Sequence, residues 1–232
     1  KLERKSKELA LADIIVTPSQ FVVDSLPTWV NREKVILSQF GSPVVSFTLQ
    51  ERTNYKKNHP LRVLFVGSMG QRKGLGDLFQ AIKLLDTSEV ELVVMGGLLE
   101  DISFYRNKFP NFVYEAPRSH PEVLALMRTC DVFCLPSIVE GRALVMQEAM
   151  SQGLPLIITP NTGGEDLVKE GETGFLVPIR SPEIIANRIQ WFLENRDCIN
   201  EMRRHAQEHA MLYTWENYSK RVINLIRQLI VK

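Results

Sequence analysis

From Pro60 onward, short and continuous apolar runs alternate with segments whose apolar residues have helical spacing. Strands that are covered by helices on both faces have such runs, because neither face presents a row of polar residues to water. A helix between each pair of runs indicates βαβ units and a parallel sheet. The sequence therefore predicts an α/β fold with a doubly wound parallel sheet. The predicted strands are residues 63–66, 92–95, 112–114, 132–135, 156–158 and 175–177.

Signals for helix starts support this alternation. Ser119 and Glu122 have the spacing of a capping box, and a helix is predicted over residues 121–128. The Ser-Pro-Glu sequence at 181–183 opens another helix, and a third is predicted over residues 75–85.

A polar stretch, residues 50–59, separates the alternating part from a shorter N-terminal part. That part has too few apolar residues for a core of its own. Its predicted elements are a helix over 2–12, an apolar run at 14–16, a helix over 18–30 and a short run at 35–37.

The charge balance excludes one class of partner. Lys and Arg number 28 and Asp and Glu number 27, so the formal net charge is +1. Proteins that bind nucleic acid usually carry a basic footprint. No nucleic-acid partner is therefore predicted, and an anionic ligand must be held by local groups.

Cysteine content favours a cytoplasmic protein. The 3 cysteines, Cys130, Cys134 and Cys198, do not form the pattern of a disulfide framework. No apolar stretch reaches the ~18 to 20 residues that span a bilayer. The chain opens on a charged helical pattern without an initiator methionine, and we expect it to be a piece of a longer protein.

The loop after the first predicted strand has the composition of a phosphate cradle. It runs from Gly67 to Gly74 with Arg72 and Lys73 near its end, and it leads into a helix. Backbone amides and cations at such a turn bind phosphate. The spacing matches neither the Walker A loop nor the dinucleotide fingerprint. A flexible turn with two solvated cations is the alternative.

The loop after the fourth predicted strand carries two carboxylates. Glu140 and Gly141 precede a helix expected to begin near Ala143, and Glu148 lies within it. The first-turn amides of that helix suit a diphosphate. Over eight helical residues the carboxylates would stand ~12 Å apart along the axis and edge one cleft. The alternative is that Glu140 only favours the helix start and Glu148 is solvated.

The motifs that follow carry a family resemblance. The Glu140-x7-Glu148 motif, a Gly-x-Pro turn at 153–155, Gly-Gly at 163–164 and the Gly-Phe-Leu-Val-Pro sequence at 174–178 occur in this order. Together they resemble the donor-binding domain of retaining glycosyltransferases of family 4, over about residues 14–226. The resemblance implies the Rossmann-like C-terminal half of a GT-B fold.

The resemblance also implies an activity, which is transfer of a sugar, of the hexosyl type, from a nucleoside-diphosphate sugar to a glycan, lipid or small-molecule acceptor. Lys73 would bind the donor diphosphate, Glu148 the ribose hydroxyls, and Glu140, as the catalytic residue, the transferred sugar. The remaining donor-binding positions would be Gly67, the backbone of Gly141, Arg142, Ala143 and Leu144, and for the base the main chain of Ala116, Pro117 and Arg118. The base, sugar and acceptor are not specified.

The sequence departs from the family pattern at two places. Ser68 stands where the family has an arginine, which leaves the diphosphate short of one cation. Arg72 is one candidate to replace it. The family's Phe-Gly is Arg142-Ala143 here, and Arg142 is either a second phosphate cation or a solvated side chain. No Asp-x-Asp cluster follows a strand, so neither a metal nor another cofactor is expected.

The resemblance divides the chain into four segments. Residues 1–46 would be a remnant of the N-terminal acceptor domain, 47–60 a linker, 61–212 the donor-binding domain, and 213–232 a helix that crosses back onto the acceptor domain. The rest of that acceptor domain would be missing, and this fragment would be inactive alone.

Other features have plainer interpretations. His205 and His209 have a spacing that zinc can use, but a solvated face with Arg203, Arg204 and Glu208 is favoured. A group of Arg188, Trp191, Phe192 and Trp215 is expected in the core and on a domain-docking surface. The apolar residues at 225–230, with Arg221, Arg227 and Lys232, are expected to pack on the missing domain, and a peripheral contact with the inner membrane face is the alternative.

Two other functions stay open. One is a GT-B sugar-nucleotide epimerase or hydrolase, and the other is a non-catalytic module that binds a nucleotide. The paired glutamates and the Gly-x-Pro turn favour the transferase over the first of these.

Overall fold

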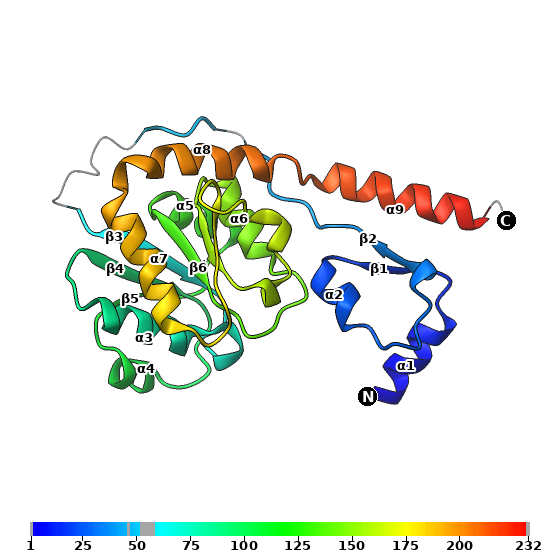
Figure 1. The fold of residues 1–232 in the computed structure, drawn as a ribbon, viewed down its shortest axis with the longest axis horizontal. Helices are drawn as coiled ribbons and strands as arrows, with labels where there is room; N and C mark the ends of the chain where they lie inside the picture. Colours follow the sequence, from blue (N-terminus) through cyan, green and yellow to red (C-terminus); the bar gives the residue numbers. More distant parts are fainter. Residues whose placement is uncertain (1, 46, 52–58, 231–232) are drawn as a thin grey trace.

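The computed structural model describes residues 2–45, 47–51 and 59–230, and it contains a parallel sheet of six strands (Figure 1). The strands are β3 (Leu61–Val66), β4 (Val90–Met95), β5 (Phe112–Glu115), β6 (Val132–Leu135), β7 (Leu156–Ile158) and β8 (Gly174–Leu176). They lie in the order β5-β4-β3-β6-β7-β8, and every neighbouring pair is parallel. The predicted fold class and all six predicted strands are confirmed.

The strand order places one crevice at the centre of the sheet. The chain passes outward from β3 through β4 to β5, and then returns to β6 on the other side of β3. Where the order reverses in this way, the two flanking loops diverge, and ligands bind outside the carboxyl ends of the strands. The loops after β3 and β6 are therefore the expected position of a site.

Helices cover both faces of the sheet (Figure 1). They are α3 (Leu75–Leu85), α4 (Ile102–Lys108), α5 (His120–Arg128), α6 (Leu144–Ser151), α7 (Pro182–Glu194) and α8 (Ile199–Ala210), whereas the last helix, α9 (Trp215–Ile230), extends away from this sheet. Helix α3 contacts α7, whereas α6 contacts α5 and α8. Between the two groups, Val63, Leu64 and Phe65 of β3 are all 0% exposed. Burial on both faces is why the strand sequences do not alternate.

The predicted helix starts are confirmed with one small shift. The capping box is present, and the backbone N–H of Ser119 donates to the Glu122 carboxylate over 3.1 Å. Helix α5 begins at His120, one residue earlier than predicted. Helix α3 has the predicted bounds.

The N-terminal part contains a small parallel sheet. Its elements are α1 (Leu2–Leu11), β1 (Ile15–Thr17), α2 (Gln20–Ser25) and β2 (Val35–Leu37), and β1 pairs with β2. The prediction that the second helix continues to residue 30 was wrong. Leu26 has extended backbone angles, because the ring of Pro27 disfavours a helical conformation at the residue before it.

Residues 38–45 attach the N-terminal part to the larger one. The backbone N–H of Ser42 donates to Tyr213 over 2.8 Å, and the Phe40 carbonyl accepts from the Gln147 side chain over 2.6 Å. The Phe40 ring stacks on Trp215, the first residue of α9. Helix α9 extends from the large sheet past the small one (Figure 1).

Parts of two predicted segments lie outside the described residues. These are residues 52–58 of the predicted linker and residues 231–232 of the predicted C-terminal helix; residues 1 and 46, the ends of the predicted N-terminal remnant, also lie outside. Among the helices of the described ranges, none is long and apolar enough to cross a membrane.

Candidate functional site

A pocket of about 530 Å³ lies at the carboxyl edge of the sheet, at the point where the strand order reverses. This volume is in the range of small-molecule sites. The pocket, called the central pocket below, is lined by Val66, Gly67, Lys73, Arg118, His120, Val123, Glu140, Arg142, Ala143, Leu144, Val145 and Glu148.

The loop after β3 is bound to the loop after β6. Gly74 has a φ of 72°, and a Cβ at this position would stand 2.0 Å from the Pro136 carbonyl oxygen, so only glycine allows the approach. The backbone N–H of Ile138 donates to the Arg72 carbonyl over 2.9 Å. Because the two loops are joined, Lys73 from one faces Glu140 from the other.

Two cations share one carboxylate oxygen. Oε1 of Glu140 lies 2.8 Å from Nζ of Lys73 and 2.6 Å from Nη1 of Arg72. The Lys73 and Glu140 side chains are 13% and 12% exposed, whereas that of Arg72 is 56% exposed. The cluster has a surplus of one positive charge, and charge-assisted hydrogen bonds make such a group suitable for an anion.

The geometry between the two glutamates differs from the helical estimate. Ala143 has extended backbone angles and α6 begins only at Leu144, so the calculation for eight helical residues was wrong. Glu140 and Glu148 nevertheless line the same pocket. The Ala143 amide donates to the Thr162 carbonyl over 3.3 Å. The first-turn amides of α6, on the pocket-lining residues Leu144 and Val145, have no acceptor within the helix.

Arg142 is buried and forms an ion pair with Asp166, whose side chain is 34% exposed. The Arg142 side chain is 0% exposed, and its Nη1 and Nη2 atoms lie 2.7 and 3.1 Å from the two carboxylate oxygens of Asp166. Nε donates to the Gln147 side chain, and Nη1 also donates to the Gly163 carbonyl. The solvated alternative was therefore wrong, and the guanidinium donors are directed to protein acceptors. Burial raises the pKa of the nearby Tyr213 hydroxyl, and the charge of Asp166 raises it further.

At the other end of the pocket, Glu148 faces a histidine that the sequence analysis did not select. Nε2 of His120 lies 3.2 Å from Oε1 of Glu148. His120 is the first residue of α5, directly after the capping Ser119. It also follows β5, so a search of every loop at a strand's carboxyl end would have found it. Val66, Val123 and Val145 are further lining residues that the sequence analysis did not select.

Four other predicted residues, Ser68, Ala116, Pro117 and Gly141, are not among the residues that line the central pocket. Pro117 is exposed, and its neighbour Arg118, which does line the pocket, forms an ion pair with Glu115. The Ser68 carbonyl accepts from the Gly70 amide. The Gly141 carbonyl accepts from the Ser19 hydroxyl, which ties the N-terminal part to the site loop.

The histidines of α8 have separate partners. Nε2 of His209 lies 2.9 Å from the Asp166 carbonyl oxygen, and His205 lies next to Arg204. Among the described residues, no group of three or more His, Cys, Asp and Glu side chains is placed to hold a metal ion. The expected solvated face is only partly correct, because Arg203 is buried.

The four residues of the predicted cluster with Arg188 do not lie together, because Trp215 is separate from the other three. Arg188 lies over the Phe175 ring, which also contacts Trp191 and the buried Phe192. Trp215 is 46% exposed on α9 instead.

Comparison with known proteins gives one family. A family model described as glycosyl transferases group 1 matches residues 47–211. A D-inositol 3-phosphate glycosyltransferase from Corynebacterium glutamicum is 32% identical over 196 residues, which are 78% of this chain and 47% of that protein. The chain spans about half the length of the curated relatives it matches.

Solved structures share the fold. A sucrose-phosphate synthase from Thermosynechococcus elongatus has a TM-score of 0.80 at 24% identity, over 99% of this chain and 61% of that one. Anabaena HepE in complex with UDP has a TM-score of 0.78 at 17% identity, over 95% of this chain and 65% of that one.

Proposed function

The chain belongs to the glycosyl transferases group 1 family, and from this premise we propose that it is the donor-binding part of a retaining glycosyltransferase of family 4. The donor is a nucleoside-diphosphate sugar, and the acceptor is a glycan, a lipid or a small molecule. One observation carries the proposal. The Lys73–Arg72–Glu140 cluster and Glu148 line or adjoin a single pocket where the strand order reverses.

The diphosphate is assigned to the positive end of the pocket. Lys73 and Arg72 supply the cations, and the unpaired amides at the start of α6 add partial positive charge. Arg72 is the better replacement for the cation that Ser68 does not provide, since Arg142 is held by Asp166. We propose on this basis that donor binding needs no divalent metal.

The ribose is assigned to Glu148. A carboxylate can accept hydrogen bonds from two neighbouring hydroxyls, and the side chain of Glu148 is 21% exposed at the pocket. His120 contacts one of its oxygens and limits the orientation of the carboxylate. The other oxygen is left for a sugar hydroxyl.

Glu140 has a different partner before and after the donor binds. In this structure the Glu140 carboxylate contacts both cations. A diphosphate attracts the same cations, so binding releases the Glu140 carboxylate toward the hydroxyls of the transferred sugar. Glu140 thereby keeps the cations in position until the donor arrives.

The acceptor half of the enzyme is proposed to lie outside this chain. The chain spans about half the length of its curated relatives, and transfer needs an acceptor aligned with the donor. The chain alone should therefore bind the donor without transferring its sugar.

Calorimetry with UDP, GDP and ADP, each with and without EDTA, tests the proposal. We expect one of these nucleotides to bind, with the same affinity in EDTA. Glu148→Gln should weaken that binding by about 1 to 3 kcal/mol, the usual loss for a hydrogen bond to a charged group. Glu172→Gln, at an exposed glutamate outside the pocket lining, is the matched control. Loss of binding in EDTA, or equal affinities for both variants, would contradict the assignment.

A further inference from the structure

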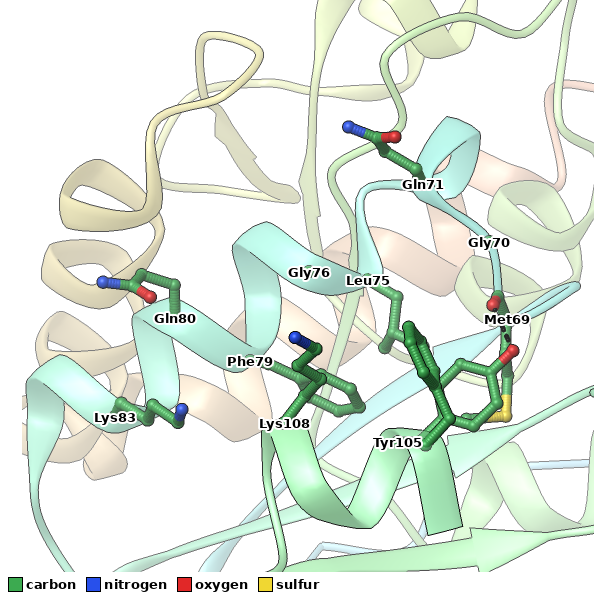
Figure 2. A pocket seen from close by; sticks show the side chains of 11 residues that line it. Met69, Gly70, Gln71, Leu75, Gly76, Phe79, Gln80, Lys83, Tyr105 and Lys108 are labelled. Atoms are coloured by element: carbon green, nitrogen blue, oxygen red, sulfur yellow. Dashed lines mark hydrogen bonds between the residues drawn. The ribbon is translucent and has the colours of Figure 1, made fainter. Parts of the chain in front are cut away.

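A second pocket, called the α3–α4 pocket below, lies between these two helices and has a volume of about 340 Å³ (Figure 2). It shares the loop after β3 with the central pocket. Met69, Gly70 and Gln71 line the α3–α4 pocket, whereas Gly67 and Lys73 line the central one. The two pockets are therefore neighbours with separate linings.

The floor of the α3–α4 pocket is apolar. Met69 and Leu75 are 2% exposed, Tyr105 is 4% and Phe79 is 5% exposed. The Tyr105 hydroxyl donates to the Met69 carbonyl over 2.8 Å and accepts from the Leu99 amide over 3.1 Å. The Tyr105 hydroxyl therefore has hydrogen-bond partners within the protein, and the floor is suited to the apolar part of a ligand.

The rim of the pocket is positively charged. Figure 2 shows Lys83 of α3 on the side away from Met69, and Lys108 of α4 in the middle of the view, beside Phe79. Within the described part of the chain, neither ammonium group has an ion-pair partner, although Lys108 lies 5.7 Å from the centre of the Phe104 ring. The lining contains no Asp or Glu. An anionic group at this rim would meet two positive charges and no negative one.

A glycine keeps the pocket open. Gly76 is the second residue of α3, where glycine lowers helix stability relative to alanine. A Cβ built on it would have no atom within 4 Å. Gly76 lines the pocket together with Leu75 and Phe79, so a large side chain at this position has room to occupy it.

We propose that the α3–α4 pocket binds an anionic amphiphile. Its acyl or aryl body would lie on Leu75, Phe79 and Tyr105, and its carboxylate or phosphate would pair with Lys83 and Lys108. A nucleoside diphosphate does not suit this pocket, because no carboxylate is present for the ribose.

Calorimetry with octanoate and octyl phosphate tests this site, with octanol and octylammonium as the uncharged and cationic controls. The two anions should bind and octylammonium should not. Gly76→Leu should abolish binding by filling the pocket, and Gly76→Ala should retain it. The Lys83→Gln/Lys108→Gln double variant should bind octanoate about tenfold more weakly or worse, since two charge-assisted contacts are lost. Lys169→Gln, at an exposed lysine outside the lining, is the matched control.

Four results would overturn the proposal. Binding of octanol as tight as octanoate, with no effect of the double lysine variant, would show a purely apolar slot, such as one for a partner's side chain. Octanoate binding that survives in Gly76→Leu, with circular dichroism showing an intact fold, would place the ligand elsewhere. Competition between octanoate and UDP would place it in the central pocket. Absence of any anion binding would also reject the site, independently of whether UDP binds.

Discussion

Glu140 should compete with the donor diphosphate for Lys73 and Arg72. A nitrogen of each cation lies within 2.8 Å of the same Glu140 carboxylate oxygen. Replacing Glu140 by Gln keeps the shape of the side chain and removes its charge. The cluster then has two positive charges where it had a surplus of one, so we expect Glu140→Gln to bind UDP more tightly.

The size of the effect follows from the geometry. The interaction that Glu140→Gln removes is the repulsion between the Glu140 carboxylate and a bound diphosphate. If the two negative charges stand about 6 Å apart, on either side of the shared cations, this repulsion is roughly 3 kcal/mol at an effective dielectric constant of about 20. Arg72 is 56% exposed, and water screens that side of the cluster. We therefore expect a gain of about 1 to 2 kcal/mol, which is about a 5- to 30-fold lower Kd for UDP. For a nucleoside-diphosphate sugar the gain should be smaller, because the variant loses the charge that faces the sugar hydroxyls.

Calorimetry on both proteins at low and high NaCl measures the difference. The advantage of Glu140→Gln for UDP should shrink as salt rises, since it is electrostatic. Glu172→Gln should bind UDP as the unchanged protein does. Equal or weaker UDP binding by Glu140→Gln, with an unchanged melting temperature, would refute the competition.

Three further predictions follow from the contacts. Lys73→Gln should raise the Kd for UDP by about 10- to 100-fold in calorimetry, because a charge-assisted contact is lost. Arg142→Met should lower the free energy of unfolding in urea by about 1 to 3 kcal/mol, because the Gln147 side chain and the Gly163 carbonyl lose their hydrogen-bond donor and Asp166 loses its ion-pair partner. The purified chain should show no sugar transfer from a donor that it binds, in an assay that follows release of the nucleoside diphosphate in the presence of acceptor sugars.

Each of these has a distinct contrary result. If Lys73→Gln and the control Lys169→Gln both leave the Kd for UDP unchanged, Lys73 does not bind the diphosphate. If Arg142→Met keeps its free energy of unfolding but no longer binds UDP, Arg142 is a phosphate-binding cation after all. Sugar transfer by the chain alone would show that the acceptor half is not required.

The sheet could be predicted because its strands are buried on both faces. Apolar runs such as that of β6, whose residues are all buried, have no polar alternation and stand out in the sequence. The alternation with helices then fixes the parallel direction and the edge at which the site lies. The same reasoning predicts that Lys73, Glu140 and Glu148 lie at one edge of the sheet, and all three line the central pocket.

Contacts between distant segments could not be predicted in this way. Arg142 and Asp166 stand 24 positions apart, and nothing in the spacing of either residue indicates that the loops after β6 and β7 join them in an ion pair. His120 was overlooked for a different reason, since a capping signal explains its neighbours and drew no attention to its side chain. Helix α2 ends before Pro27. The prediction extended it to residue 30 because the apolar residues keep a helical spacing beyond that proline.

The family match and the unit that shapes the site have different boundaries. The matched region begins at residue 47, but Ser19 holds the Gly141 carbonyl and Phe40 holds the Gln147 side chain that in turn orients Arg142. A protein shortened to start at residue 47 would therefore lack both partners. The Gly141 carbonyl, next to Glu140, and the Gln147 amide, next to Glu148, would lose these hydrogen bonds. A shortened protein for ligand screening or crystallisation should therefore start before Ser19, so that the contacts of Ser19 and Phe40 with the site are kept.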